Sequence, residues 1–192
     1  MKSRAYRQLA RAVSTEETRT AILDAVDEIF LPNPGRTFSL DEVAQRAGTT
    51  VQTVLRHFGS KVGLLEEAAR RGLTRVKSGR DEVPAGDLAA IAAYLARHYE
   101  ESAPMVLRML AVEHEAPEVA KIVQQGRDMH RAWVERVLGS ELRRAKRPER
   151  RRRLAMLIAA TDLLTWKLLR MEQRLSQRDY QRSILELLEA LS

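Results

Sequence analysis

The chain has 192 residues, of which 44% are hydrophobic and 31% charged, with nine glycines, six prolines and no cysteine. This composition argues against a disordered chain, a disulfide scaffold and a thiolate metal site, and the scarcity of glycine and proline favours helices. The net charge is +7, and residues 1–80 hold 14 Lys and Arg against 9 Asp and Glu. The concentration of positive charge there points to a polyanion such as nucleic acid, although a merely soluble basic protein fits the charge equally well.

No targeting or membrane segment is visible in the sequence. Residues 1–13 are basic but lack the apolar core of a secretory signal, and no run approaches 18 uncharged apolar residues. The absence of cysteine fits a reducing compartment. We therefore expect a soluble, cytoplasmic protein.

The first predicted helices are marked by capping residues. Ser14 and Glu17 have capping-box spacing, and Ser39 and Glu42 repeat it. The segment LPNPG (31–35) separates the two helices, because two prolines and a glycine cannot continue a helix. The inward faces are expected to comprise Ile22, Val26, Ile29 and Phe30 in the first helix and Leu40, Val43, Ala44 and Ala47 in the second.

A helix-turn-helix is predicted over about residues 39–58. Gly48 stands where the second helix must end with a positive φ, and a third helix runs from Thr49 or Thr50 to about His57. Gly59 closes the third helix, and Ser60 caps a fourth that reaches roughly Val76. Short helices separated by a glycine turn inside a small bundle are typical of this motif.

The remainder of the chain also has helical periodicity. The polar segment 78–86 is the expected domain boundary, and helices are expected over 87–101, from Pro104, and from Pro117 to about Leu142. We find no internal repeat and no strand pattern. The prediction is an all-α fold with an N-terminal helix-turn-helix DNA-binding bundle and a helical ligand-binding and dimerisation domain. The expected ranges are a basic arm (1–14), the DNA-binding domain (15–77) and the C-terminal domain (86–192).

The start of the third predicted helix has the chemistry of a major-groove reader, because the second helix of this motif points its N-terminal residues at base edges. Thr49 and Thr50 are small enough for close approach, Gln52 offers the donor and acceptor that adenine requires, and Arg56 can reach guanine or the backbone. Phosphate contacts are expected for Thr53, His57 and Lys61. Each residue alone also fits a solvated helix surface, and Thr50 also fits an N-cap.

The segments TRTAILDAVDEIF and FSLDEVAQRAGTTVQTVLRHFGSKVGLL resemble the tetracycline-repressor (TetR/AcrR) family of transcriptional regulators, over roughly residues 15–75. The Ala-Gly turn, Thr53, the pair His57 and Phe58, and Lys61 followed by two leucines carry the resemblance. It implies a homodimer that pairs through its last helices, usually with a ligand pocket in the C-terminal half. One departure is Leu55, where the family has a tyrosine that contacts a phosphate.

Two sets of C-terminal residues are candidates for these implied roles. The dimer-interface candidates, which also fit a monomer core, are Leu157, Thr161, Leu164, Leu168, Ile184, Leu187, Leu188 and Leu191. The ligand-pocket candidates, which also fit simple core filling, are Tyr94, His98, Met105, Met109, Met129, Trp133, Met156, Asp162 and Trp166. The effector they imply is small and hydrophobic.

The remaining polar features of the sequence indicate no catalytic or metal-binding site. The basic run 143–153 is interpreted as a solvated connector, with a charged partner as the alternative, and residues 1–14 as an arm that either enters the minor groove or stays a free tail. No metal-ligand spacing, cofactor motif or catalytic constellation is found, so we expect neither a metal, nor a cofactor, nor an enzyme. The predicted function is a homodimeric repressor released from a near-palindromic operator by an effector, and the alternative is a ligand-independent architectural or protein-interaction dimer.

Overall fold

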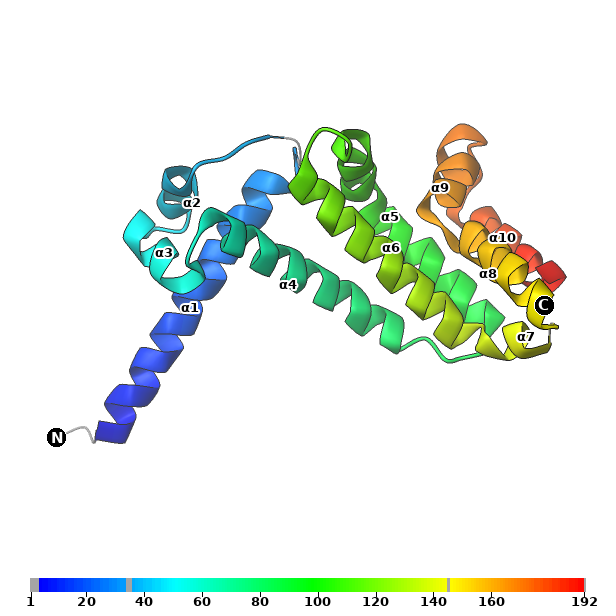
Figure 1. The fold of residues 1–192 in the computed structure, drawn as a ribbon, viewed down its shortest axis with the longest axis horizontal. Coiled ribbons are helices and arrows are strands. Elements are labelled where there is room, and N and C mark those ends of the chain that lie inside the picture. The colour runs from blue at the N-terminus through cyan, green and yellow to red at the C-terminus, as the bar shows by residue number, and fades with distance from the viewer. Residues whose placement is uncertain (1–3, 34–35, 145, 192) are drawn as a thin grey trace. The chain divides into compact units, whose positions relative to one another are not determined.

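The computed structural model describes residues 4–33, 36–144 and 146–191, and these form helices with no strand (Figure 1). The helices are α1 (Arg4–Phe30), α2 (Leu40–Arg46), α3 (Val51–Phe58), α4 (Lys61–Asp81), α5 (Leu88–Val112), α6 (Pro117–Val137), α7 (Gly139–Arg144), α8 (Arg147–Thr161), α9 (Leu163–Trp166), the π-helical turn η1 (Lys167–Glu172) and α10 (Gln177–Leu191). They divide into two compact units, Met1–Thr74 and Arg75–Ser192, so the division falls within α4 rather than in the predicted polar segment 78–86. The predicted all-α fold is confirmed.

The first helix begins earlier than the sequence pattern indicates. Helix α1 starts at Arg4, so the predicted N-cap at Ser14 is wrong, and the carbonyl of Ser14 instead accepts a hydrogen bond from Thr18 Oγ1 at 2.8 Å within the helix. The residues upstream are good helix formers without a glycine or proline, so nothing stops the helix there. Of the predicted basic arm, residues 1–3 lie outside the described residues, as do the side chains of residues 4–12.

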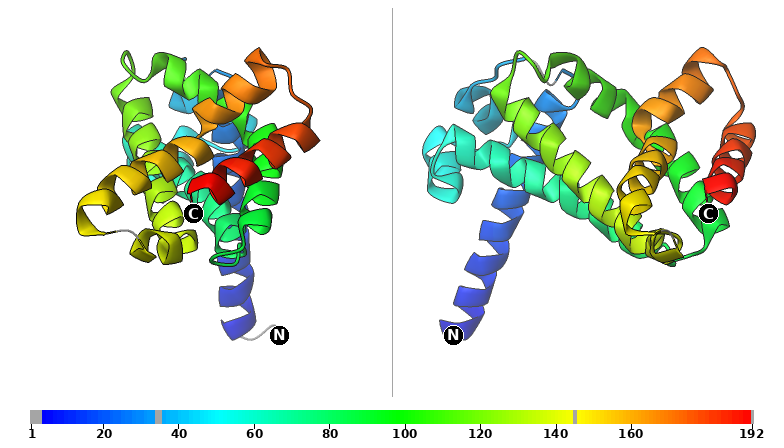
Figure 2. Two further views of the ribbon diagram at one scale, coloured as in Figure 1. Left: turned by 90° about the vertical axis from the view of Figure 1, so that its right-hand side faces the viewer. Right: turned by 45° about the vertical axis from the view of Figure 1, so that its right-hand side comes forward.

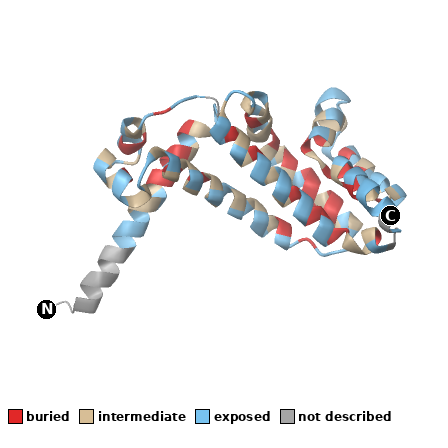
Figure 3. Cartoon of the chain, viewed as in Figure 1, coloured by how far each residue is buried: buried red, intermediate tan, exposed pale blue. Residues whose placement is uncertain are grey.

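Unit 1 has a small core into which α1 to α4 each point one face (Figure 3). The predicted inward residues Ile22 and Val26 of α1, Val43 of α2 and Val54 of α3 are each at most 1% exposed. The second capping box is confirmed in part, because Ser39 Oγ accepts from the Glu42 backbone N–H at 3.1 Å. Burial of one face and a side-chain cap explain why helices of seven and eight residues are stable here.

Ion pairs join α1 to α4. Arg71 of α4 donates to Asp24 at 2.7 Å and to Asp27 at 2.6 Å, while Arg19 of α1 pairs with Glu67. The side chain of Arg71 is 20% exposed, so these contacts lie partly out of water and hold more firmly than surface pairs. These arginines are therefore engaged within unit 1 and are not free to bind another anion.

Gly63 of α4 allows the start of this helix to approach α3 closely. A methyl group at this position would clash with the backbone carbonyl oxygen of Phe58, the last residue of α3. Gly63→Ala is therefore expected to displace the end of α3 and to destabilise unit 1 by about 1–3 kcal/mol. Thermal unfolding by circular dichroism and hydrogen exchange of α3 amides measure the two effects.

Gly72 of the same helix is the matched control, because a methyl group there would have no atom within 4 Å. Gly72→Ala is expected to stabilise α4 by about 0.5–1 kcal/mol through helix propensity alone. Equal effects of the two substitutions would contradict the close approach at Gly63.

Unit 2 is a helical bundle in which α5 packs against α6 and α10, and α8 lies beside α6 and α10 (Figure 2). Helix α5 continues through Pro104, so the predicted separate helix starting there is wrong. Proline removes one helical hydrogen bond, but Ala103 and Met109 on either side of it are buried in unit 2, and their packing keeps the helix continuous. Likewise α6 ends at Val137, and a separate short helix, α7, follows it.

The long apolar stripe predicted over residues 154–168 is broken at Asp162. This residue is extended (φ −76°, ψ 154°), and its side chain caps α9 by accepting from the Leu164 N–H at 2.8 Å. The break leaves the Thr161 carbonyl without a helical partner, and the buried Tyr99 hydroxyl donates to it at 2.8 Å. The predicted single stripe therefore lies on two helices, α8 and α9, and the chain changes direction between them at the N-cap Asp162.

Four of the residues predicted to lie at a dimer interface are not available for contact with a second chain. Leu157, Thr161, Ile184 and Leu188 are each 0% exposed, because they point into the core of unit 2 rather than outward. A core-facing stripe and a partner-facing stripe have the same helical period, so periodicity did not separate them.

Candidate functional site

Helices α2 and α3 form a helix-turn-helix. Gly48 follows α2 with φ +62°, the left-handed conformation that glycine adopts without strain. Thr50 is the N-cap of α3, and its Oγ1 accepts from the Thr53 N–H at 3.2 Å. Val54 is 0% exposed and anchors α3 to the core of unit 1. The turn, the cap and the anchor together fix which face of α3 points outward.

The outward face of α3 has side chains three and four residues apart. Gln52, Leu55 and Arg56 are exposed, with Leu55 at 39%. Within the part of the chain that the structure describes, neither Gln52 nor Arg56 has a side-chain partner, so both retain their hydrogen-bonding capacity for an external molecule. Leu55 has no hydroxyl to donate, unlike the tyrosine that the family resemblance implies at this position.

The other predicted DNA contacts border this face. Thr49, Thr53 and His57 are half-buried, and Thr53 Oγ1 lies 3.1 Å from Thr50 Oγ1. Lys61 is in the first turn of α4, and its ammonium lies 4.8 Å from the centroid of the Phe38 ring. This cation–π contact steadies the lysine beside the helix N-terminus, where an anion is favoured.

The predicted pocket residues separate into groups in unit 2. Tyr94, His98 and Trp133 lie together, with the Tyr94 and His98 rings stacked at 5.3 Å and the Tyr94 and Trp133 rings 5.7 Å apart. Trp166 instead donates to Glu100, while Asp162 is the helix cap described above. Met109 is buried, and Met105 and Met129 are half-buried.

A hydrogen-bonded chain of buried polar groups adjoins the Tyr94 cluster. Arg80 Nη2 lies 3.2 Å from His130 Nδ1, His130 Nε2 lies 3.1 Å from Thr161 Oγ1, and Thr161 Oγ1 donates to the Leu157 carbonyl at 2.8 Å. Because a guanidinium can only donate, His130 Nδ1 is the acceptor and its Nε2 bears the proton that points at Thr161. The contacts thus determine a single neutral tautomer.

Burial keeps both histidines of this region neutral. It lowers the pKa of His130 to about 3, and the charge of Arg80 adds to the effect. Burial likewise lowers the pKa of His98 to about 4, again assisted by Arg80. The guanidinium of Arg80 thus acts on both histidines.

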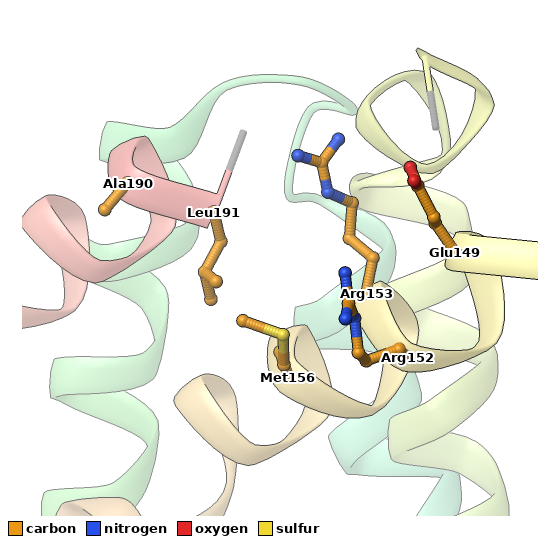
Figure 4. A pocket seen from close by; sticks show the side chains of 6 residues that line it. All are labelled: Glu149, Arg152, Arg153, Met156, Ala190 and Leu191. Atoms are coloured by element: carbon orange, nitrogen blue, oxygen red, sulfur yellow. The ribbon is translucent and has the colours of Figure 1, made fainter. Parts of the chain in front are cut away.

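A shallow pocket of about 170 Å³ lies between α8 and α10, where Met156 and Leu191 point toward one another (Figure 4). It is lined by Glu149, Arg152, Arg153, Met156, Ala190 and Leu191. Of the predicted ligand residues only Met156 lines it, and two arginines of the 143–153 run border it. The run itself belongs largely to α8, so its interpretation as a connector was only partly correct.

An exposed apolar surface remains on the C-terminal helices. Leu164, Leu168 and Met171, which follow one another at helical spacing over α9 and η1, are 57%, 46% and 55% exposed, and Leu187 of α10 is 40% exposed. Water-exposed side chains of this size in one region are typical of a surface that another molecule covers. Met171 was not among the residues that the sequence singled out.

Sequence reasoning missed Arg80 and placed Thr161 in the wrong role. One signal for Arg80 was present, because Leu73, Val76 and Arg80 continue the inward stripe of α4 at spacings of three and four. An arginine on an apolar stripe indicates a buried charge.

Among the described residues there is no group of acidic, histidine or cysteine side chains arranged to hold a metal ion. None of the helices that the structure describes is both long enough and apolar enough to cross a membrane.

The fold and the α2–α3 geometry define an all-helical protein of the helix-turn-helix class. Residues 22–68 match the family model for "Bacterial regulatory proteins, tetR family". A curated relative, the HTH-type transcriptional regulator SrpR of Pseudomonas putida, is 38% identical over 55 residues, which cover 29% of this chain and 26% of that protein. Residues 22–68 of the N-terminal unit are therefore similar to the tetR family of bacterial regulatory proteins, while the chain spans about a quarter of the length of the curated protein that it matches.

Most of the chain also has the fold of a solved structure. A transcriptional regulator from Rhodococcus sp. Rha1 superimposes with a TM-score of 0.61 and 22% sequence identity, over 93% of this chain and 95% of that one. The likeness extends the shared architecture from the helix-turn-helix to the helical bundle of unit 2.

Proposed function

We propose that this protein is a homodimeric DNA-binding transcriptional regulator, a repressor that leaves its operator when a small molecule binds unit 2. The observation that carries the proposal is the outward face of α3, where Gln52 and Arg56 are exposed beside the N-cap Thr50. The first turn of a recognition helix contacts base edges in the major groove. The two proteins to which the chain is similar are both transcriptional regulators, which supports the proposal.

In this proposal the residues of the interface have two kinds of role. Thr50, Gln52 and Arg56 read base edges, while Thr53, His57 and Lys61 bind phosphates and set the register. Thr49 allows the close approach. Leu55 lies on the reading face and cannot donate to a phosphate, but its isobutyl group suits the methyl group of thymine.

The exposed apolar surface of Leu164, Leu168, Met171 and Leu187 is the proposed dimer interface. It retains three of the predicted candidates, adds Met171 and places Leu191 at its border, beside the pocket between α8 and α10. A two-fold dimer would place two reading helices in successive major grooves about 34–36 Å apart, or a multiple of that distance. An effector would release DNA by favouring a dimer whose reading helices no longer match this spacing, which requires different affinities for the two states.

Selection from random duplex DNA tests the proposed function. The full chain is expected to enrich a sequence with two-fold symmetry and two half-sites, because each protomer of a symmetric dimer contacts equivalent bases. Sequencing of successive rounds measures the enrichment. Recovery of DNA without any shared sequence would contradict the proposal.

A dimer-surface variant provides the second arm of this experiment. The double substitution Leu164→Glu and Leu168→Glu is expected to give a monomer by light scattering and to lower affinity for the selected element by about 100-fold or more, since the two half-sites are no longer linked. Val13→Glu in α1, at a position 50% exposed, is the control and is expected to remain a dimer. If the double variant stays dimeric, the dimer interface does not include Leu164 and Leu168.

A further inference from the structure

Arg80 is the most buried arginine that the structure describes, yet no carboxylate neutralises it. Its side chain and backbone together are 6% exposed. Among the described residues the guanidinium makes polar contacts with His130 and Tyr94 but forms no ion pair with an aspartate or glutamate. Its Nε is buried without a hydrogen-bond partner. A buried charge without a counter-charge destabilises the fold, and proteins rarely retain one that has no role.

Two other arginines show how this chain normally neutralises such groups. Arg71, at 20% exposure, pairs with two aspartates, and Arg170, at 23%, binds Glu100 through Nε at 2.6 Å and Nη2 at 3.0 Å. Both are less buried than Arg80, although desolvation makes a counter-charge more necessary as burial increases. The missing partner at Arg80 is therefore the exception in this molecule.

We propose that Arg80 is the anion-binding group of a ligand site in unit 2, and that its ligand is a small organic monocarboxylate. The inference rests on the proposed function, because it names the chemical class of the effector. It also changes the predicted hydrophobic effector to an acid with an apolar body.

The geometry around the guanidinium favours a carboxylate. Nε has no partner, Nη2 lies 3.2 Å from the neutral His130 Nδ1, and the guanidinium also hydrogen-bonds the Tyr94 hydroxyl. The buried Nε–H is therefore the donor that remains for a carboxylate oxygen. The rest of the ligand requires an apolar surface. Trp133, whose ring centroid lies 5.4 Å from Arg80 Cζ, and the stacked rings of Tyr94 and His98 provide it.

The same surroundings argue against a phosphate dianion. Arg80 is one positive charge, and His98 and His130 are neutral at physiological pH. A single guanidinium balances one negative charge and would leave a dianion with an uncompensated charge in a buried site. A singly charged acid matches the charge that the site supplies.

Fluorescence titration of the full chain tests the proposal. Trp166→Phe leaves Trp133 as the sole tryptophan, so its emission reports on the surroundings of Arg80. The probes are acetate, hexanoate, benzoate and phenylacetate, none of which fluoresces like tryptophan, and each is paired with its neutral amide. A saturable change with at least one acid, absent with the matching amide, is the expected result. No saturable change with any acid would overturn the proposal.

A substitution at Arg80 tests the identity of the site. Arg80→Met keeps the length of the side chain without its charge and is expected to weaken acid binding by about tenfold to a hundredfold, measured as loss of the ligand-induced rise in Tm. Arg131→Met on α6, where the side chain is 58% exposed, is the matched control and is expected to bind like wild type. An acid response that persists in Arg80→Met would overturn the assignment. If that variant does not fold, the titration of the Trp166→Phe chain decides.

These measurements use no DNA, so they separate this inference from the proposed function. A chain that binds acid through Arg80 but selects no DNA sequence would overturn the regulator and leave the anion site. A chain that selects its operator but ignores every acid would overturn the anion site alone. Release of operator by acid in wild type but not in Arg80→Met would support both.

Discussion

Gln52→Ala is expected to relax the base preference of the protein, whereas Lys61→Ala is expected to weaken its binding to all sequences alike. Gln52 is exposed on the reading face of α3, and a bidentate amide contact discriminates between bases by about 1–3 kcal/mol. Lys61 lies at the start of α4, where it can bind only the DNA backbone in the proposed complex. Each lost phosphate contact should lower the log–log salt slope by about 0.9, or about twice that for two protomers.

Anisotropy titrations with the selected operator, its single-base variants and a salt series measure both quantities. Gln45→Ala in α2, also an exposed glutamine, is the control for Gln52 and should leave base preference unchanged. Lys61→Arg keeps the charge and the contact with Phe38, so it should retain most of the salt slope. If the alanine variants at 52 and 61 changed specificity and salt dependence equally, the division into base readers and phosphate contacts would be wrong.

The second large effect is a loss of stability in mild acid caused by His130. Its pKa is lowered to about 3 in the folded chain by burial and by Arg80, whereas an unfolded histidine titrates near about 6.5. Between these values the unfolded state binds a proton that the folded state does not. Stability is therefore highest above about pH 6.5 and falls as the pH drops, by about 1.4 kcal/mol per pH unit for this residue.

His130→Gln isolates this contribution. The amide oxygen can accept from Arg80 and the amide nitrogen can donate to Thr161, so the variant keeps both hydrogen bonds but does not titrate. We expect the free energy of unfolding to fall less steeply with decreasing pH than in wild type. His98, whose lowered pKa acts in the same direction, is present in both proteins and cancels in the comparison.

Urea unfolding at a series of pH values, followed by tryptophan fluorescence, measures this difference. Both tryptophans, Trp133 and Trp166, lie in unit 2, so the signal reports the unit that contains His130. Parallel pH dependences for wild type and His130→Gln would show that the histidine does not remain neutral in the folded chain.

Local signals in the sequence predicted most of unit 1. Ser39, Gly48 and Thr50 act on the backbone within a few residues of themselves, so a cap or a positive φ is visible without knowledge of the rest of the fold. The residues of α3 that face outward follow directly from these end points and from the anchor Val54. Their role in DNA binding stays a prediction for the experiments above.

Local signals failed where packing overrode them. The capping-box pattern at Ser14 and the proline at 104 are both real sequence features, but each lies inside a longer helix. For Pro104 the reason is burial on both sides of the proline, and for Ser14 it is the absence of any residue upstream that stops a helix.

The sequence by itself determined an all-helical chain with a helix-turn-helix, because helix period, caps and glycine turns are properties of neighbouring residues. Only the tertiary structure decided which C-terminal leucines are core and which are exposed, since Leu157 and Leu164 share the same periodicity. It also brought Arg80 to His130, 50 positions away, and His130 to Thr161, 31 positions away. Contacts over such separations depend on how whole helices pack against one another, and no pattern within a single helix contains that information.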